Sequence, residues 1–460
     1  KVGEWSRTQT SDTAGLLADA PGVSLLGSGG LASLPSLHGL GDERVRILVN
    51  GMSTDVACAN HMNPPLSSIA PVRVATAAVH AGITPVSRGG DSIGGTVSVE
   101  SPRPEFPGAG LVAHGRVSVF NRSAADSRAA DAAFTLSTPV VSFGYAGAYV
   151  TADNYSAGGG AAVKSTFYES WNHAVQLGVR AGRHRLTAEA GLQRIPQEGF
   201  VNARMDLTRN DTTSLNIGYD TDFGRGRFET RGFVQKTEHD MNILRDKVPG
   251  MNMPMYTKGQ TLGYSAQVTL WPTARDLVRV GTDGQRFTLD DWWPGVMAVV
   301  GSMGPDTLVN VNDGRRNRTG LYAEWEARHR DGWSSQLGVR ADLVRMDTGN
   351  VTGYNSSPTA TGSAAYLADA QAFNAVAHDR ADNNLEVTAS TRVELNGRGT
   401  VEAGYARKMR SPTLYERYLW VARSNMSVQM NGWFGDANGY TGNLDLRPER
   451  ADTFSATLTA

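Results

Sequence analysis

The sequence predicts an all-β transmembrane antiparallel barrel of about 14 strands, preceded by a small mixed α/β domain. Two observations support this fold class. Up to about Pro107 the chain mixes short helical and strand patterns, and beyond it paired segments alternate apolar and polar residues. Short turns and long polar stretches follow one another in this second part, as they do between the strands of membrane barrels. We therefore expect one domain over residues 1–107 and a barrel over 108–460.

The first domain shows three local signals. Ser11 or Asp12 can cap a short amphipathic helix within "SDTAGLLADAPGVSLL". The segment "VRILVNG" predicts a buried strand closed by the turn pair Asn50-Gly51. A further strand is expected from Thr96 to Val99, after the glycine-rich "RGGDSIGGT", which we interpret as structural because it is neither a Walker loop nor G-x-G-x-x-G.

The second domain is built from strand pairs, such as "HAVQLGVRAGRHRLTAEAGLQRI" around Gly182-Arg183. Long polar stretches, such as 246–260 and 347–384, lie between the pairs. A soluble propeller or solenoid is the alternative, but the chain lacks the fixed repeat that such folds require. Aromatic residues near the expected strand ends suit an interfacial girdle: Trp271, Trp292, Trp293, Tyr322 and Trp325.

The composition excludes several classes of protein. Lys and Arg number 44 against 45 Asp and Glu, and no basic stretch indicates nucleic acid as a partner. The mean hydropathy is −0.32, and no apolar run approaches the roughly 18 residues that a membrane-spanning helix needs. One cysteine cannot form an internal disulfide. The serine of "SPTLY" has no nucleophile context, so we expect no enzyme.

Several segments resemble TonB-dependent outer-membrane receptors. "DTAGLLADAPGVSLL", "PSLHGLGDERVRILVNG" and "VSRGGDSIGGTVSVES" resemble the family's plug domain, and "YARKMRSPTLYERY" and "GNLDLRPERADTFSATL" resemble its late barrel strands. The resemblance implies a plug inside the lumen of a barrel of about 22 strands, of which about eight would lie beyond this sequence. It also implies a monomer in the lipid of a Gram-negative outer membrane, coupled to the inner-membrane TonB complex.

Further segments resemble the copper receptors of this family, the OprC and NosA type. They are "ACANHMNPP", "GFVNARMDLTRNDTTSLNIGY" and "KTEHDMNILRDKVPGMNMPMYTKGQTLGYS". The resemblance implies that Cys58 and Met62 are the plug ligands of a copper ion and that Met205 and Met241 are the barrel ligands.

The chemistry of these residues agrees with copper. Thiolate and thioether are soft ligands that select Cu(I), whereas zinc sites hardly ever use methionine. The spacing of Cys58 and Met62 permits either one face of a helical turn or a loop that points both side chains toward the extracellular mouth. The plainer alternative is a small buried cysteine beside a gap-filling methionine.

Other residues are secondary candidates. Met251, Met253 and Met255 can face one side of an extended loop and catch Cu(I), or they can pack beneath the loop. His61 and His239 flank the proposed ligands, either as supporting residues, as Cu(II) contacts or as solvent-facing loop residues. For Met426 and Met430 we favour packing, and both lie outside the residues that the structure describes.

These inferences lead to a functional expectation with two alternatives. We expect a receptor that binds copper as Cu(I) between plug and barrel and imports it by TonB-coupled transport. The alternatives are a receptor for a siderophore or haem, and a structural or adhesive barrel with a permanent plug. Siderophore and haem receptors usually present aromatic and arginine-rich loops, whereas this chain places methionines beside a thiol.

Overall fold

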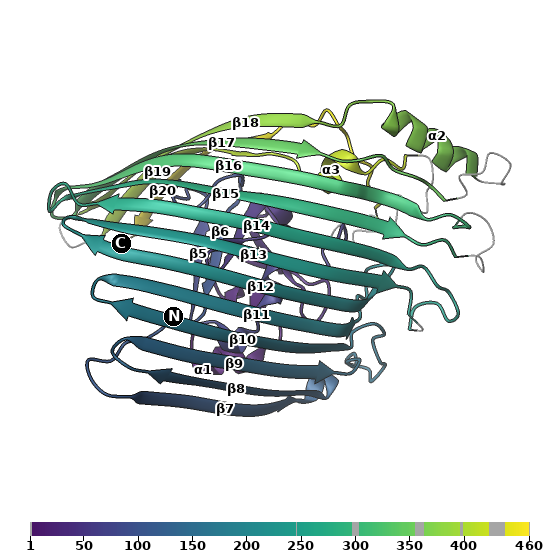
Figure 1. Cartoon of the computed structure of the whole chain (residues 1–460), viewed down its shortest axis with the longest axis horizontal. Coiled ribbons are helices and arrows are strands. Elements are labelled where there is room, and N and C mark those ends of the chain that lie inside the picture. The colour runs from purple at the N-terminus through teal and green to yellow at the C-terminus, as the bar shows by residue number, and fades with distance from the viewer. Residues whose placement is uncertain are drawn as a thin grey trace.

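The computed structural model describes residues 2–244, 246–296, 303–354, 363–395, 399–422 and 438–459. One antiparallel sheet of 14 strands dominates the molecule, and the small N-terminal domain lies behind it in Figure 1. The sheet runs in chain order from β7 to β20, and these two strands form its edges, so the barrel is not closed. The predicted fold class and the number of strands are confirmed.

The strands of this sheet are β7 (Val112–Arg122), β8 (Ser127–Ser137), β9 (Val141–Ala152), β10 (Tyr168–Ala181), β11 (His184–Glu198), β12 (Asp206–Phe223), β13 (Gly226–Asn242), β14 (Met255–Leu270), β15 (Asp276–Trp293), β16 (Leu308–Arg330), β17 (Trp333–Asp347), β18 (Arg380–Glu394), β19 (Thr400–Arg410) and β20 (Glu449–Thr459). The helices between or before them are α1 (Glu4–Gln9), α2 (Ser363–Asn374), α3 (Leu414–Tyr418) and the 3₁₀ turns η1 (Thr13–Leu17), η2 (Asp42–Arg44), η3 (Pro65–Ser68), η4 (Pro71–Arg73) and η5 (Ser123–Ala125).

Alternation along the strands separates two faces of the sheet. On β16, Leu321 is 63% exposed on the outer face while Arg318 is 2% exposed on the inner face. Side chains that alternate in this way give an apolar outer surface and a polar lumen, which is the arrangement of membrane barrels. Among the described residues, no helix is both long enough and apolar enough to cross a membrane.

The connections differ at the two ends of the sheet. Short turns lie at the left end in Figure 1, and the long loops with α2 lie at the right end. In outer-membrane barrels short turns face the periplasm and long loops face the exterior, so the right end corresponds to the extracellular side.

The expected aromatic girdle is only partly present. Trp271 and Trp325 are exposed near the short turns. Trp293 and Tyr322 are buried instead, and the hydroxyl of Tyr322 donates to Gln267 at 3.0 Å. That expectation is wrong for these two residues, because their positions in the alternation place them on the lumen side.

The small domain contains a four-stranded sheet of order β4-β3-β6-β5 and a hairpin of β1 (Val23–Leu26) with β2 (Leu34–Leu37). The sheet strands are β3 (Val45–Val49), β4 (Met52–Ser53), β5 (Thr76–Ala81) and β6 (Gly95–Glu100). Asn50 and Gly51 have φ of 50° and 74°, as the expected hairpin turn requires. Asp12 caps the segment expected as an amphipathic helix, which is the 3₁₀ turn η1 instead of a longer α-helix.

Polar contacts join this domain to strands far apart in the large sheet. Arg73 donates to Asn172 on β10 at 2.9 Å, and the N–H of Ser411 after β19 donates to Asp91 at 2.9 Å. The large sheet therefore curves around the small domain, as a barrel wall does around a plug.

Candidate metal site

The segment that carries Cys58 is a tight turn. The N–H of His61 donates to the carbonyl of Cys58 at 3.1 Å, and His61 adopts a left-handed φ of 53°. Regular helical structure begins only at Pro65 with η3. Of the two conformations that the spacing allowed, the structure has the loop, and the helical turn was wrong.

Cys58 lies at the boundary between plug and barrel. Its side chain is buried, and its Sγ atom lies 3.5 Å from Sδ of Met241 on β13. Burial raises the pKa of the Cys58 thiol to about 12, although the backbone N–H groups of Asn60 and Met62 act in the opposite direction. The thiol is therefore neutral at physiological pH, and a metal ion must displace its proton to form the thiolate ligand.

Met241 connects this thiol to the extracellular end of the barrel wall. It stands one residue before the end of β13 and lies opposite Met255, the first residue of β14. Directly opposed residues of an antiparallel pair point to the same face, so both thioethers face the lumen. Met62, Met241 and Met255 are all buried in the same apolar cluster as Cys58.

His239 lies two residues before Met241 and shares its face of the strand. Its Nδ1 atom is 3.2 Å from Oδ1 of Asn210, which also accepts from the side-chain amide of Asn63 at 3.2 Å. Because Asn210 offers an oxygen, Nδ1 carries the proton and Nε2 keeps its lone pair. Nε2 is buried with no hydrogen-bond partner among the described residues. A neutral imidazole held in this way has the form of a metal ligand.

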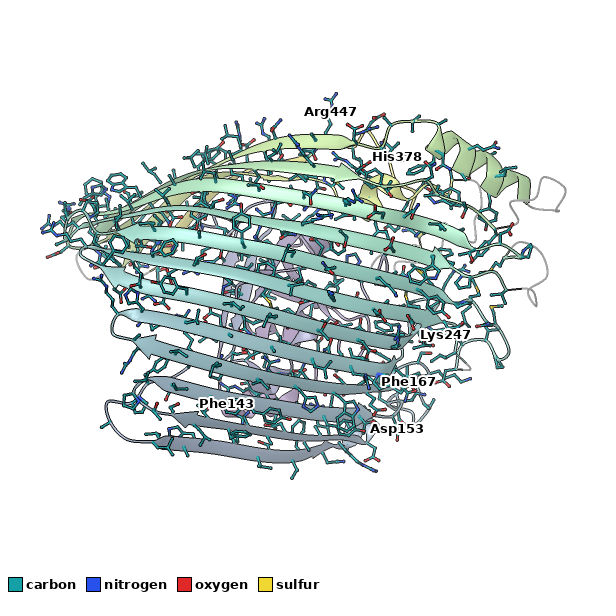
Figure 2. All side chains as sticks on the ribbon, viewed as in Figure 1. Phe143, Asp153, Phe167, Lys247, His378 and Arg447 are labelled. Carbon is teal, nitrogen blue, oxygen red and sulfur yellow. The ribbon has the colours of Figure 1, made fainter. Side chains whose placement is uncertain are left out.

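Met205 occupies a loop that an ammonium group holds in place. Met205 is fully buried and immediately precedes β12. Lys247 lies at the end of the sheet that carries the long loops (Figure 2). Its Nζ atom donates to the carbonyls of Phe200 and Ala203 at 2.6 Å each and lies 3.4 Å from Asp206. These contacts fix the loop around Met205 within the apolar cluster that contains Cys58, although the structure shows no direct contact between the two sulfurs.

The three loop methionines do not form one exposed face. Met251 is 38% exposed, whereas Met253 and Met255 are buried at 4% and 0%. The N–H of Met253 donates to the side-chain oxygen of Asn242 at 2.7 Å, which draws the loop back toward β13. The expectation of a common face is wrong, because β14 begins at Met255 and draws this end of the loop inward.

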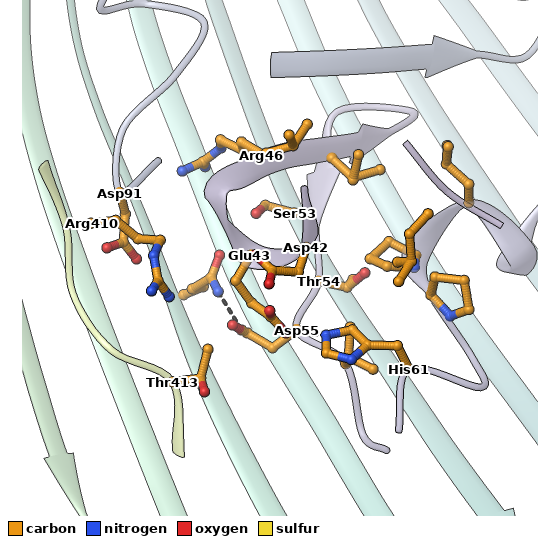
Figure 3. A pocket seen from close by; sticks show the side chains of 18 of the residues that line it. Asp42, Glu43, Arg46, Ser53, Thr54, Asp55, His61, Asp91, Arg410 and Thr413 are labelled. Carbon is orange, nitrogen blue, oxygen red and sulfur yellow. Dashed lines mark hydrogen bonds and ion pairs between the residues drawn. The ribbon is translucent and has the colours of Figure 1, made fainter. Parts of the chain in front are cut away.

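His61 faces a different partner. Its Nε2 atom lies 2.8 Å from Oε1 of Glu43, and both residues line a cavity below the turn (Figure 3). Burial opposes the charge on Glu43, but the charge and hydrogen bond of His61 outweigh it and lower the pKa of Glu43 to about 2. The structure thus assigns His61 to an ion pair within the plug.

Sequence reasoning did not identify two residues that support the site. The hydroxyl of Tyr415 on α3 donates to the carbonyl of Ala57 at 3.0 Å, next to Cys58. Asn210 orients His239, as described above. The only sequence signal near Tyr415 is the capping box of Thr413 and Glu416. A capping box predicts the helix α3 but not the residues that the helix contacts.

Sulfur donors dominate the surroundings of Cys58, and, in addition to burial, the nearby carboxylate of Asp291 opposes ionisation of its thiol by raising its pKa. Among the described residues, no group of three His, Cys, Asp or Glu side chains could hold a metal ion. A site here would therefore depend on thioethers and one thiolate, which suit a soft monovalent ion.

Comparisons with known proteins define the class. The family described as "TonB dependent receptor-like, beta-barrel" matches residues 141–459, and "TonB-dependent Receptor Plug Domain" matches residues 3–96. The chain belongs to the TonB-dependent receptors. Members of this family are transporters of Gram-negative outer membranes, not enzymes, and work with the TonB complex. A comparison with curated protein sequences finds no match.

Solved structures share the fold at low sequence identity. The copper transporter OprC is 19% identical with a TM-score of 0.80, and the match covers 98% of this chain and 68% of OprC. The siderophore receptor PirA from Pseudomonas aeruginosa is 18% identical with a TM-score of 0.65, covering 99% and 69%. The Serratia marcescens hemophore receptor HasR, solved with HasA and heme, is 14% identical with a TM-score of 0.70, covering 97% and 66%. These likenesses show the fold and leave the cargo to the chemistry of the site.

Proposed function

We propose that this chain is an outer-membrane receptor that binds copper as Cu(I) between plug and barrel and imports it with energy from the TonB complex. Residues 1–107 are the plug in this proposal, and 108–460 belong to the barrel. The observation that carries the proposal is the contact of Cys58 with Met241, which places a plug thiol against a barrel thioether at the extracellular end.

The ligand set in this proposal combines residues of the plug and of β13. Cys58 and Met62 supply two sulfur atoms from the plug, and Met241 supplies one from β13. His239 supplies nitrogen through Nε2, which lacks another partner among the described residues. Met205 and Met255 complete the sulfur-rich surroundings. A thiolate and a monovalent cation balance in charge, so a buried Cu(I) needs no further counter-ion.

The cargo is tested with the purified wild-type protein. It is offered Cu(I) under reducing conditions, Zn²⁺, a ferric siderophore and haem in separate samples, and bound ligand is measured after desalting. We expect about one copper per chain and none of the other three ligands, because soft donors discriminate against harder ions. Retention of the siderophore or haem without copper would show that the alternative, a receptor for a siderophore or haem, is correct. Retention of nothing would favour a barrel with a permanent plug.

His239 provides a second expected result. His239→Leu should lower the affinity for Cu(I) by about 10–100-fold, because a nitrogen ligand is lost while the sulfur donors remain. X-ray absorption of the copper-loaded protein should show a nitrogen contribution in the wild type and none in the variant. A nitrogen contribution of equal size in both proteins would exclude His239 as a ligand.

A further inference from the structure

A cavity lies directly below the turn that carries Cys58. Its volume is about 80 Å³, and its lining includes Val56, His61 and Pro64 of the turn region (Figure 3). Gln285 of β15 and Arg316 of β16 line it from the barrel wall. This space therefore adjoins the turn that carries Cys58.

A second cavity continues toward the opposite end of the barrel. Its volume is about 570 Å³, and its lining includes Arg185, Tyr219 and Arg227. Arg185 and Arg227 are each the second residue of a strand that starts at a short turn, on β11 and β13. The second cavity thus reaches the end that corresponds to the periplasmic side.

The two cavities are neighbours with a common partition. Four residues line both of them: Arg46, Ser53, Gln285 and Arg318. Gln285 donates from its side-chain amide to the carboxylate of Asp55 in the plug, and this bond ties the plug to the wall at the partition together with the ion pair of Arg46 with Asp283. The Oε1 atom of Gln285 is buried and has no hydrogen-bond partner among the described residues. Only one end of this amide is held, and rotation of the side chain breaks a single bond.

The partition carries charges of both signs. The guanidinium groups of Arg46 and Arg318 lie against Asp283, at 3.5 Å in the case of Arg46, and Arg316 is paired with Asp91. Asp55 forms no ion pair with a Lys or Arg side chain in the described part of the chain, and its bonding partner is the neutral amide of Gln285.

We propose that these two cavities form the route by which the cation bound at Cys58 leaves toward the periplasm, and that Gln285 is the residue that closes the route. The identity of the cation rests on the proposed function, whereas the route rests on the shared walls and on the single Gln285–Asp55 bond. In this arrangement a shift of the plug that breaks this bond and the ion pair of Arg46 with Asp283 joins the two cavities.

The experiment introduces a bulky side chain at the partition and compares copper binding with copper uptake. Gln285→Trp places a bulky ring between the cavities, and Gln235→Trp is the matched control. Gln235 lies on β13 and lines a third gap with Val49 and Met52, and none of the four partition residues lines that gap. Copper per chain is measured on purified protein, and copper uptake is measured in copper-limited cells that express each variant. We expect Gln285→Trp to keep its bound copper and to lose about tenfold in uptake, because a narrowed pore blocks passage, while Gln235→Trp matches the wild type in both.

The outcomes separate the two proposals. Wild-type uptake by Gln285→Trp, or an equal loss in both tryptophan variants, would overturn the route. Ser53→Phe, which fills the same partition from the plug, gives the decisive result if Gln285→Trp does not reach the membrane, with the same expected loss of uptake. Absence of copper from the purified wild type would instead reject the proposed cargo, and it is measured before any uptake experiment.

Discussion

Cys58→Ala should lower the affinity for Cu(I) by more than about 100-fold, which is the largest effect expected of any single substitution in this chain. The thiolate is the only anionic sulfur available, because the chain contains no other cysteine. Its removal leaves neutral thioethers and an imidazole around a buried cation, and a buried charge without a counter-charge is costly. The measurement is a competition titration against a Cu(I) chelator of known affinity under reducing conditions.

Two further variants make this result specific. Cys58→Ser keeps an acceptor for the N–H of Asn60, which lies 3.4 Å from Sγ, but it replaces a soft donor with a hard one. It should lose copper as Cys58→Ala does. Met346→Leu alters another buried methionine of the same apolar cluster and should bind copper normally. Normal copper binding by Cys58→Ala would demote the cysteine to a packing residue and end the copper proposal.

The fold was largely predictable from the sequence because it depends on local patterns. Alternation along β16 and β17 predicts which side chains face the lumen, and turn pairs such as Asn50-Gly51 determine where strands end. The pattern failed for Trp293 and Tyr322, since an aromatic residue near a strand end can face either side. The position of the residue in the alternation along the strand determines which face it points to, and composition does not.

The candidate site was predictable only in part because it joins distant segments. Cys58 and Met241 are 183 positions apart, and their contact depends on how the plug sits in the barrel. The spacing within the plug could not decide between a helical turn and a loop. The single hydrogen bond from His61 to Cys58 and the left-handed φ of His61 decide it in the structure. The role of Asn210 in orienting His239 has no local sequence signal.

Met241→Leu should weaken Cu(I) binding by about 100-fold while leaving the fold intact. Exchanges of Met and Leu in a core usually cost less than about 1.5 kcal/mol of stability, so the loss reports on the sulfur atom. Met241 is the barrel residue whose sulfur contacts the thiol of Cys58, and its loss leaves the plug sulfurs without that bridge to the wall.

The comparison with Met62→Leu tests whether Met241 connects plug to barrel through the copper ion or only supplies one of several thioether ligands. Both variants remove one thioether, but only Met241→Leu removes the sulfur that connects the barrel to Cys58. If copper joins plug to barrel, adding Cu(I) should protect the wild-type plug from protease, and Met241→Leu should lose most of this protection even when copper is saturating. Met62→Leu should keep the protection at saturation, because Cys58 and Met241 still share the ion. Equal protection in both variants at saturating copper would show that the ion is held by the plug alone, and Met241 would then be a packing residue above the site.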